Sequence, residues 1–224
     1  MSERRPEESI ELEAARRCVL EVVHEMNRVG LTEGSAGNVS MRTRAGEIVL
    51  TPTAMAYAEM TAQDLVVADE NGTVAPGQRL ATTEIGLHMA CLKRHSDIAA
   101  VVHTHPIHAS MFAVNHQSIP CVLEEFEFAI GGDVRVAPYF PTGSKELGDA
   151  VAELLGDRAA ALMSNHGLVV VGSSPSEALH LTKLVERAAQ IVWGASAMGD
   201  PKPLPEENRR IFRSQYLERR SQCS

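Results

Sequence analysis

The segment that most constrains the fold is an uninterrupted apolar run in the middle of the chain, Ile98-Ala-Ala-Val-Val-His103. It is rich in β-branched residues, as is typical of a central strand. Pro106 lacks the backbone N–H that a sheet ladder needs, so we expect the strand to end near His105. The run therefore predicts a central strand that finishes in two histidines.

Amphipathic helices and short strands alternate on both sides of this run. Ser174-Pro-Ser-Glu177, for example, combines a capping serine, a first-turn proline and a glutamate that reaches back. Thr82 or Thr83 is expected to cap an earlier helix. We expect helices at 8–28, 82–94, 110–115, 144–155 and 174–198. We expect strands at 39–43, 47–51, 64–69, 98–103, 134–137, 160–163 and 168–171.

The organisation of these elements predicts a single α/β domain over residues 1–224. No linker, internal repeat or low-complexity tract divides the chain, and its length is sufficient for a hydrophobic core. After Gly199, the proline-rich stretch PKPLPEE indicates a spacer. Residues 199–224 are therefore expected to form a flexible C-terminal segment.

Charge and composition argue against several classes of protein. With 21 basic and 29 acidic residues the formal charge is −8, and no basic stripe is visible, so we expect no nucleic-acid partner. No apolar stretch is long enough to span a bilayer, and the N-terminus lacks a secretory core. A cytoplasmic protein without a membrane partner is expected. Four scattered cysteines make neither a disulfide framework nor a cysteine-rich zinc module: Cys18, Cys91, Cys121 and Cys223.

Three histidines indicate a metal site. His103 and His105 lie on the same side of a strand, about 7 Å apart at the backbone, and their nitrogens can converge on one ion. His166 interrupts an apolar region where an unpaired imidazole is costly to bury, and Gly167 allows close backbone approach. Three histidines with a carboxylate match a catalytic zinc site that keeps one position open. The remaining histidines are interpreted as surface or packing residues: His24, His88, His95, His108, His116 and His180.

Glu84 is the candidate carboxylate, as fourth ligand or as catalytic base. It lies at a helix start, where an acid is also favoured simply by the helix dipole. The same helix start offers free amides and the hydroxyls of Thr82 and Thr83, a natural cradle for phosphate. Two small-residue loops are further candidate phosphate contacts or else ordinary turns: Gly37-Asn38 and Thr53-Ala54.

Seven segments, in this order, resemble the class II aldolase and epimerase family of the L-fuculose-1-phosphate aldolase and L-ribulose-5-phosphate 4-epimerase type. They are GSAGNVS at 34–40, LTPT at 50–53, TTE at 82–84, VHTH at 102–105, AIGG at 129–132, APY at 137–139 and NHGL at 165–168. The resemblance implies a three-layer α/β fold with a central, largely antiparallel sheet flanked by helices. It also implies a cyclic homotetramer with active sites at subunit interfaces.

The resemblance also assigns site residues. His103, His105 and His166 correspond to the zinc ligands, and Glu84 to the acid that ligates the metal at rest and acts as base during turnover. Zinc is implied, although such a site also accepts Mn²⁺, Co²⁺ or Fe²⁺. The positions that contact substrate phosphate in the family are Gly37, Asn38, Thr53, Ala54, Thr82 and Thr83.

The implied activity is that of a metal-dependent aldolase. It would cleave a ketose 1-phosphate similar to L-fuculose 1-phosphate into dihydroxyacetone phosphate and a short aldehyde, through a metal-stabilised enediolate. Glu84 favours this branch, because the epimerases place Asp there. Three other family enzymes stay open: a sugar-phosphate 4-epimerase, a sugar-acid phosphate decarboxylase and a methylthioribulose-1-phosphate dehydratase. A non-enzymatic alternative is an interaction module that resembles the adducin head.

One departure from the fuculose aldolases concerns the proton donor. Those enzymes carry a tyrosine shortly before the Gly-Gly pair, whereas this chain reads Glu124-Glu-Phe-Glu-Phe128, with Glu125 nearest that place. Tyr139 and Tyr216 are candidate substitutes. The acids of this segment either tune substrate choice or form a solvated strand face.

Overall fold

The computed structural model describes residues 6–222, and within them seven strands form one sheet. Their order across the sheet is β3-β2-β1-β4-β7-β6-β5, and every neighbouring pair is antiparallel except β5 and β6. The strands are β1 Asn38–Arg42, β2 Ile48–Leu50, β3 Val66–Ala68, β4 Ala100–Thr104, β5 Arg135–Ala137, β6 Ala160–Met163 and β7 Gly167–Gly172. The apolar run thus forms the middle strand, β4, as predicted.

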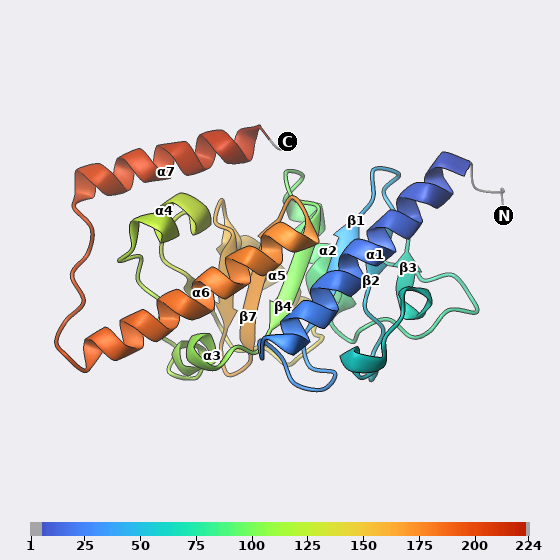
Figure 1. The fold of residues 1–224 in the computed structure, drawn as a ribbon, viewed down its shortest axis with the longest axis horizontal. Helices are drawn as coiled ribbons and strands as arrows, with labels where there is room; N and C mark the ends of the chain where they lie inside the picture. Colours follow the sequence, from blue (N-terminus) through green and yellow to red (C-terminus); the bar gives the residue numbers. More distant parts are fainter. Residues whose placement is uncertain (1–5, 223–224) are drawn as a thin grey trace.

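Helices cover both faces of this sheet (Figure 1). They are α1 Pro6–Arg28, α2 Ile85–Arg94, α3 Ile107–Val114, α4 Glu124–Ile130, α5 Lys145–Leu155, α6 Pro175–Ser196 and α7 Glu206–Ser221, with short 3₁₀ turns η1 Tyr57–Glu59 and η2 Ala62–Asp64. Val102 of β4 packs in the apolar cluster under α1 and α6, whereas its neighbour Val101 packs in the cluster under α2 and α5. The predicted three-layer α/β fold with a largely antiparallel sheet is confirmed.

Among the helices predicted from the sequence, the starts of α2 and α3 differ most from the prediction. Helix α2 is capped by Glu84 rather than by Thr82 or Thr83, and its side chain makes no capping hydrogen bond. Helix α3 begins at Ile107, earlier than predicted, because Pro106 supplies a fixed backbone angle (φ −69°) suited to its cap position.

Helix α4 corrects the interpretation of the acidic segment as a solvated strand face. Apolar Phe126 and Ile130 recur at helical spacing and are buried, and Gly131 ends the helix in the left-handed region (φ 83°). Glu127 is also buried, at 3% exposure, and forms an ion pair with Arg209 of α7 (2.9 Å). The negative charge of Glu127 is therefore paired with Arg209 inside the protein rather than exposed to solvent.

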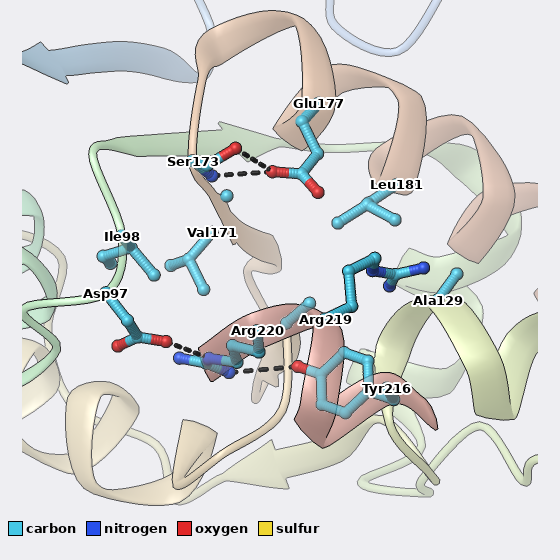
Figure 2. Close-up of a pocket in the computed structure, with 12 residues that line it drawn as sticks. Asp97, Ile98, Ala129, Val171, Ser173, Glu177, Leu181, Tyr216, Arg219 and Arg220 are labelled. Carbon is cyan, nitrogen blue, oxygen red and sulfur yellow. Dashed lines mark hydrogen bonds and ion pairs between the residues drawn. The ribbon is translucent and has the colours of Figure 1, made fainter. Parts of the chain in front are cut away.

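The C-terminal segment contains helix α7, which lies beside α4 (Figure 1). Tyr216 is buried and its hydroxyl donates to the carbonyl oxygen of Asp157 (2.7 Å). Arg220 joins this tyrosine to Asp97 at the start of the β4 segment, as Figure 2 shows. The segment is thus partly helical and anchored to the sheet, while its predicted flexibility stays a prediction. Among the described residues, no helix combines the length and apolar character needed to cross a bilayer.

Candidate metal centre

The three predicted ligands meet at one end of the sheet. His103 lies near the end of β4, His105 follows that strand, and His166 lies in the turn between β6 and β7. One ring nitrogen of each lies within 4.8 Å of the others, and the Nε2 atoms of His103 and His105 are 3.0 Å apart. The ring centroids are 4.7 to 5.2 Å apart. This convergence is what binding of a single ion by three imidazoles requires.

The backbone holds His103 in a defined tautomer. Its Nδ1 lies 3.0 Å from the carbonyl oxygen of Leu168 on β7 and must donate to it, because a carbonyl oxygen only accepts. Its Nε2 is then the atom directed at the other ligands. Hydrogen bonds from the second ring nitrogen to a backbone carbonyl orient metal-binding histidines generally.

Gly167 makes this convergence sterically possible. A Cβ atom at this position would lie 2.5 Å from the carbonyl oxygen of Thr104 and 2.6 Å from the His105 ring. It would also lie 3.2 Å from the His103 ring. The prediction that this glycine permits close backbone approach is confirmed.

Glu84 brings a carboxylate to the same place from the start of helix α2. Its Oε2 lies 3.2 Å from His103 Nε2, and its Oε1 lies 3.6 Å from His166 Nε2. The residue is only 4% exposed, and its Oε1 atom finds no hydrogen-bond partner among residues 6–222. A buried carboxylate that lies against His103 and His166, with one oxygen left without a partner, fits a divalent cation.

Electrostatics keep Glu84, His105 and His166 in the protonation states that a metal needs. Burial raises the pKa of Glu84, but hydrogen bonding and charge from His103 outweigh burial and hold that pKa well below its usual range. Burial, and then the neighbouring His103, lower the pKa of His105 to about 4 and also lower the pKa of His166. At neutral pH the carboxylate is therefore charged, and these two imidazoles present lone pairs.

The candidate phosphate segments gather beside this centre. Thr82 N donates to the carbonyl oxygen of Thr51 (3.1 Å), and Thr53 N donates to that of Leu80 (3.0 Å), so the two loops run side by side. Gly37 adjoins β4: a Cβ there would lie 2.6 Å from the His103 carbonyl oxygen. Among the other candidates, Thr83 and Ala54 are exposed, Ala54 has a left-handed backbone (φ 53°), and Thr82 is buried.

Asn38 takes a position that the sequence did not reveal. Its side-chain amide donates to Glu84 Oε2 (2.9 Å) and to Thr82 Oγ1 (3.1 Å) rather than pointing to solvent. His88, interpreted as a packing residue, is fully buried and lies behind this amide. The sequence signal that could have placed His88 near the site is its spacing: it lies four residues after Glu84, and residues four apart share one helix face.

The two candidate tyrosines lie at opposite ends of the sheet. Tyr216 is buried against Asp157, at the other end of β4 from the histidines, and its hydroxyl is occupied. Tyr139 is 63% exposed and follows β5, whose last residue, Ala137, accepts a hydrogen bond from Ser164 Oγ (2.7 Å) close to His166 in the chain. Glu125, nearest the missing tyrosine, forms an ion pair with Arg187 (2.5 Å).

Fold and site together define an α/β protein with a three-histidine, one-carboxylate centre able to hold a divalent ion. Residues 17–193 match the class II aldolase and adducin N-terminal domain family, and the chain belongs to this family. The family identified from the sequence motifs is thereby confirmed.

Similar proteins cover most of the chain. The 5-deoxy-D-ribulose 1-phosphate aldolase of Bacillus thuringiensis is 36% identical over 179 residues, which are 80% of this chain and 84% of that protein. The L-fuculose phosphate aldolase of Escherichia coli K12 is 36% identical over 188 residues, 84% of this chain and 86% of that protein. A solved L-fuculose 1-phosphate aldolase superposes with a TM-score of 0.86 at 29% identity, covering 91% and 96% of the two chains. These relatives support a lyase.

Proposed function

We propose that this protein is a metal-dependent aldolase that cleaves a ketose 1-phosphate to dihydroxyacetone phosphate and a short aldehyde. The observation that carries the proposal is the buried Glu84 carboxylate, which lies against two of the three convergent imidazoles and whose Oε1 has no hydrogen-bond partner within residues 6–222. Relatives named as aldolases of L-fuculose phosphate, 5-deoxyribulose 1-phosphate and 5-methylthioribulose 1-phosphate support the same substrate class.

His103, His105 and His166 would hold the ion, with Glu84 as the fourth ligand at rest. Zn²⁺ suits three imidazoles and a carboxylate, and Mn²⁺, Co²⁺ and Fe²⁺ suit the same set. When bound, the ion supplies Lewis-acid stabilisation of the negative charge that develops on substrate oxygens.

Glu84 moves the proton at the reacting carbon. In cleavage, the hydroxyl on carbon 4 loses its proton, the bond between carbons 3 and 4 breaks, and carbon 4 becomes the aldehyde. The carbon 4 hydroxyl proton leaves to solvent through the group that faces that oxygen, and the charged Glu84 takes up one proton from solvent. Glu84 then delivers this proton to carbon 3 of the resulting enediolate, so no net proton is gained or lost. In the synthetic direction Glu84 removes that proton, for which its low pKa keeps it in the charged form at neutral pH.

The substrate phosphate binds beside Glu84 in this proposal, at the backbone of Gly37 and Asn38 and at Thr53, Ala54, Thr82 and Thr83. Thr82 Oγ1 lies within reach of two donors, the amide of Asn38 (3.1 Å) and the backbone N–H of Glu84 (3.3 Å). Its own hydroxyl hydrogen is then directed to a further acceptor. The start of helix α2 adds a favourable dipole for an anion.

We propose that Tyr139 exchanges the proton of the carbon 4 oxygen: it accepts this proton during cleavage and donates it in the synthetic direction. The loop that carries it runs from Ala137, tied to Ser164, to Gly143, where a Cβ atom would lie 2.8 Å from the carbonyl oxygen of Thr83. It therefore spans from the His166 turn to the Glu84 segment. Tyr139→Phe should lower kcat with little change in bound metal. An unchanged kcat would exclude Tyr139 as the donor.

The homotetramer with interface active sites belongs to the same proposal, as does a cytoplasmic location. Helix α3 starts two residues after His105, and its Ile107 is 65% exposed; Trp193 of the adjoining α6 is 55% exposed. Exposed apolar side chains of this size at the metal end are suited to a subunit contact. Light scattering should give four times the chain mass of 24.3 kDa. A monomeric mass would contradict it.

The activity is tested by incubating the protein with L-fuculose 1-phosphate, 5-deoxyribulose 1-phosphate and 5-methylthioribulose 1-phosphate, coupling dihydroxyacetone phosphate release to NADH oxidation. Release should disappear with chelator and return with a divalent ion. His103→Ala should remove bound metal and activity together, whereas full activity in that variant without metal would exclude this mechanism. No release from any substrate by fully metallated protein would favour an epimerase, decarboxylase or dehydratase.

A further inference from the structure

A chain of buried polar side chains lies behind Glu84, and we call Ser40, His88 and Asn38 the Glu84 support network. Ser40 Oγ lies 2.6 Å from His88 Nδ1, and His88 Nε2 lies 2.5 Å from Asn38 Oδ1. Asn38 Nδ2 then lies 2.9 Å from Glu84 Oε2. Ser40 and His88 are fully buried, and Asn38 is 3% exposed. The network connects the interior between β1 and α2 to the metal centre.

The donors and acceptors of this network can be assigned in only one way. Asn38 presents its NH₂ group to Glu84, since its Nδ2 lies 2.9 Å from Oε2 and a carboxylate oxygen is an acceptor. Asn38 Oδ1 then faces His88, which must donate from Nε2. A neutral imidazole that donates from Nε2 accepts at Nδ1, so Ser40 supplies the last hydrogen. Burial lowers the pKa of His88 to about 3, in agreement with a neutral ring.

Two strand positions and two helix positions make the arrangement possible. Asn38 and Ser40 alternate on β1 and face the same side, while Glu84 and His88 lie one helical turn apart at the start of α2. The rigid strand therefore fixes the carboxylate that the helix carries. The amide occupies Oε2 and leaves Oε1, which has no hydrogen-bond partner in the described part of the chain, facing His166.

We propose that the Glu84 support network is a positioning device that holds the Glu84 carboxylate in the orientation used for metal binding and proton transfer. This rests on the proposed role of Glu84. Both amide hydrogens of Asn38 are already used, on Glu84 and Thr82. Asn38 therefore acts through Glu84, and His88 and Ser40 act through Asn38.

His88→Leu and His88→Gln test the proposal. Leucine removes the donor to Asn38 Oδ1 and lets the amide turn, whereas the glutamine amide can still donate. Metal affinity of the full chain is measured by titrating metal-free protein with Co²⁺ and with Zn²⁺. Loss of such an orienting partner typically costs roughly 10- to 100-fold in metal affinity or activity. We expect that loss in His88→Leu, with KM for the ketose 1-phosphate changed less than kcat, and substantial recovery in His88→Gln.

His95→Leu is the matched control. His95 is also buried, at the end of α2, and its Nε2 bonds to the carbonyl oxygen of Ala152 (2.9 Å), away from Glu84. This variant should lose thermal stability and keep metal affinity and kcat. If His88→Leu does not fold, Ser40→Ala, which removes only the outermost donor, should still weaken metal binding.

Two results would overturn the proposal. One is folded His88→Leu, or folded Ser40→Ala, with wild-type metal affinity and kcat. The other is His88→Gln impaired as strongly as His88→Leu, which would mean that His88 only fills space. Metal titration needs no substrate, so a wrong aldolase assignment would leave this test intact.

Discussion

At the scale of single residues, the position most sensitive to substitution is one that carries no side chain. A methyl group at Gly167 meets the Thr104 carbonyl oxygen at 2.5 Å and the ring of His105 at 2.6 Å. To make room for the methyl group, the end of β4 or the rings of His103 and His105 would have to move. Either movement would separate the ligand nitrogens. Gly167→Ala should therefore weaken metal binding by at least about 10-fold, as other losses of ligand orientation do. Metal titration of the metal-free protein measures this.

Gly194 in α6 provides the comparison for that substitution. A Cβ there meets nothing within 4 Å, so Gly194→Ala should keep metal affinity and raise stability by roughly 0.5–1 kcal/mol. Equal metal affinity in both alanine variants would show that the close approach at Gly167 is not required for the centre.

At the scale of elements, a substitution in helix α7 tests the role of its buried residue Tyr216. Its hydroxyl donates to the Asp157 carbonyl oxygen (2.7 Å) and accepts from Arg220 (3.0 Å), as Figure 2 shows for Arg220. Tyr216→Phe should lower the free energy of unfolding by about 1 kcal/mol, the usual net value of such a hydrogen bond. Because α7 is anchored beside Asp97, at the beginning of the β4 segment, metal affinity and kcat should not change.

Urea unfolding and steady-state kinetics separate the two roles considered for Tyr216. Arg210→Gln is the control on the same helix, since its exposed ion pair with Glu206 contributes little. Lost kcat with wild-type stability in Tyr216→Phe would instead favour Tyr216 as a proton donor to a neighbouring site.

At the scale of the whole molecule, the sequence was sufficient for features that are local in the chain. Short apolar runs rich in β-branched residues predict strands such as β4, and the spacing of His103 and His105 predicts ligands on one side of β4. Helix α4 was misread because three glutamates hid its apolar face, and Glu127 becomes buried only when Arg209 arrives from α7. The Glu84 support network depends on how α2 docks against β1, which no local pattern in the sequence specifies.

Stability of the metal-free protein should depend on pH through its buried histidines. Burial lowers the pKa of His88 to about 3 and that of His105 to about 4, from an ordinary value of 6.5, and lowers the pKa of His166. Below pH 6.5 the unfolded chain takes up protons that the folded protein refuses, so stability falls as pH drops. Each group contributes at most about 1.4 kcal/mol per pH unit. Carboxylates titrate lower, so the histidines dominate between pH 6.5 and 5.

Thermal unfolding in the presence of chelator, at pH 7, 6 and 5, checks this dependence. The midpoint should fall steadily over that range, and His88→Gln should make the fall shallower because it removes one buried ring. Replacing the exposed His180 by Gln should leave the slope unchanged. Without chelator, saturating Zn²⁺ should raise the midpoint and preserve its fall with pH, since bound metal also excludes protons from His105 and His166. A midpoint independent of pH from 7 to 5 in the metal-free protein would mean that these rings accept protons in the folded state.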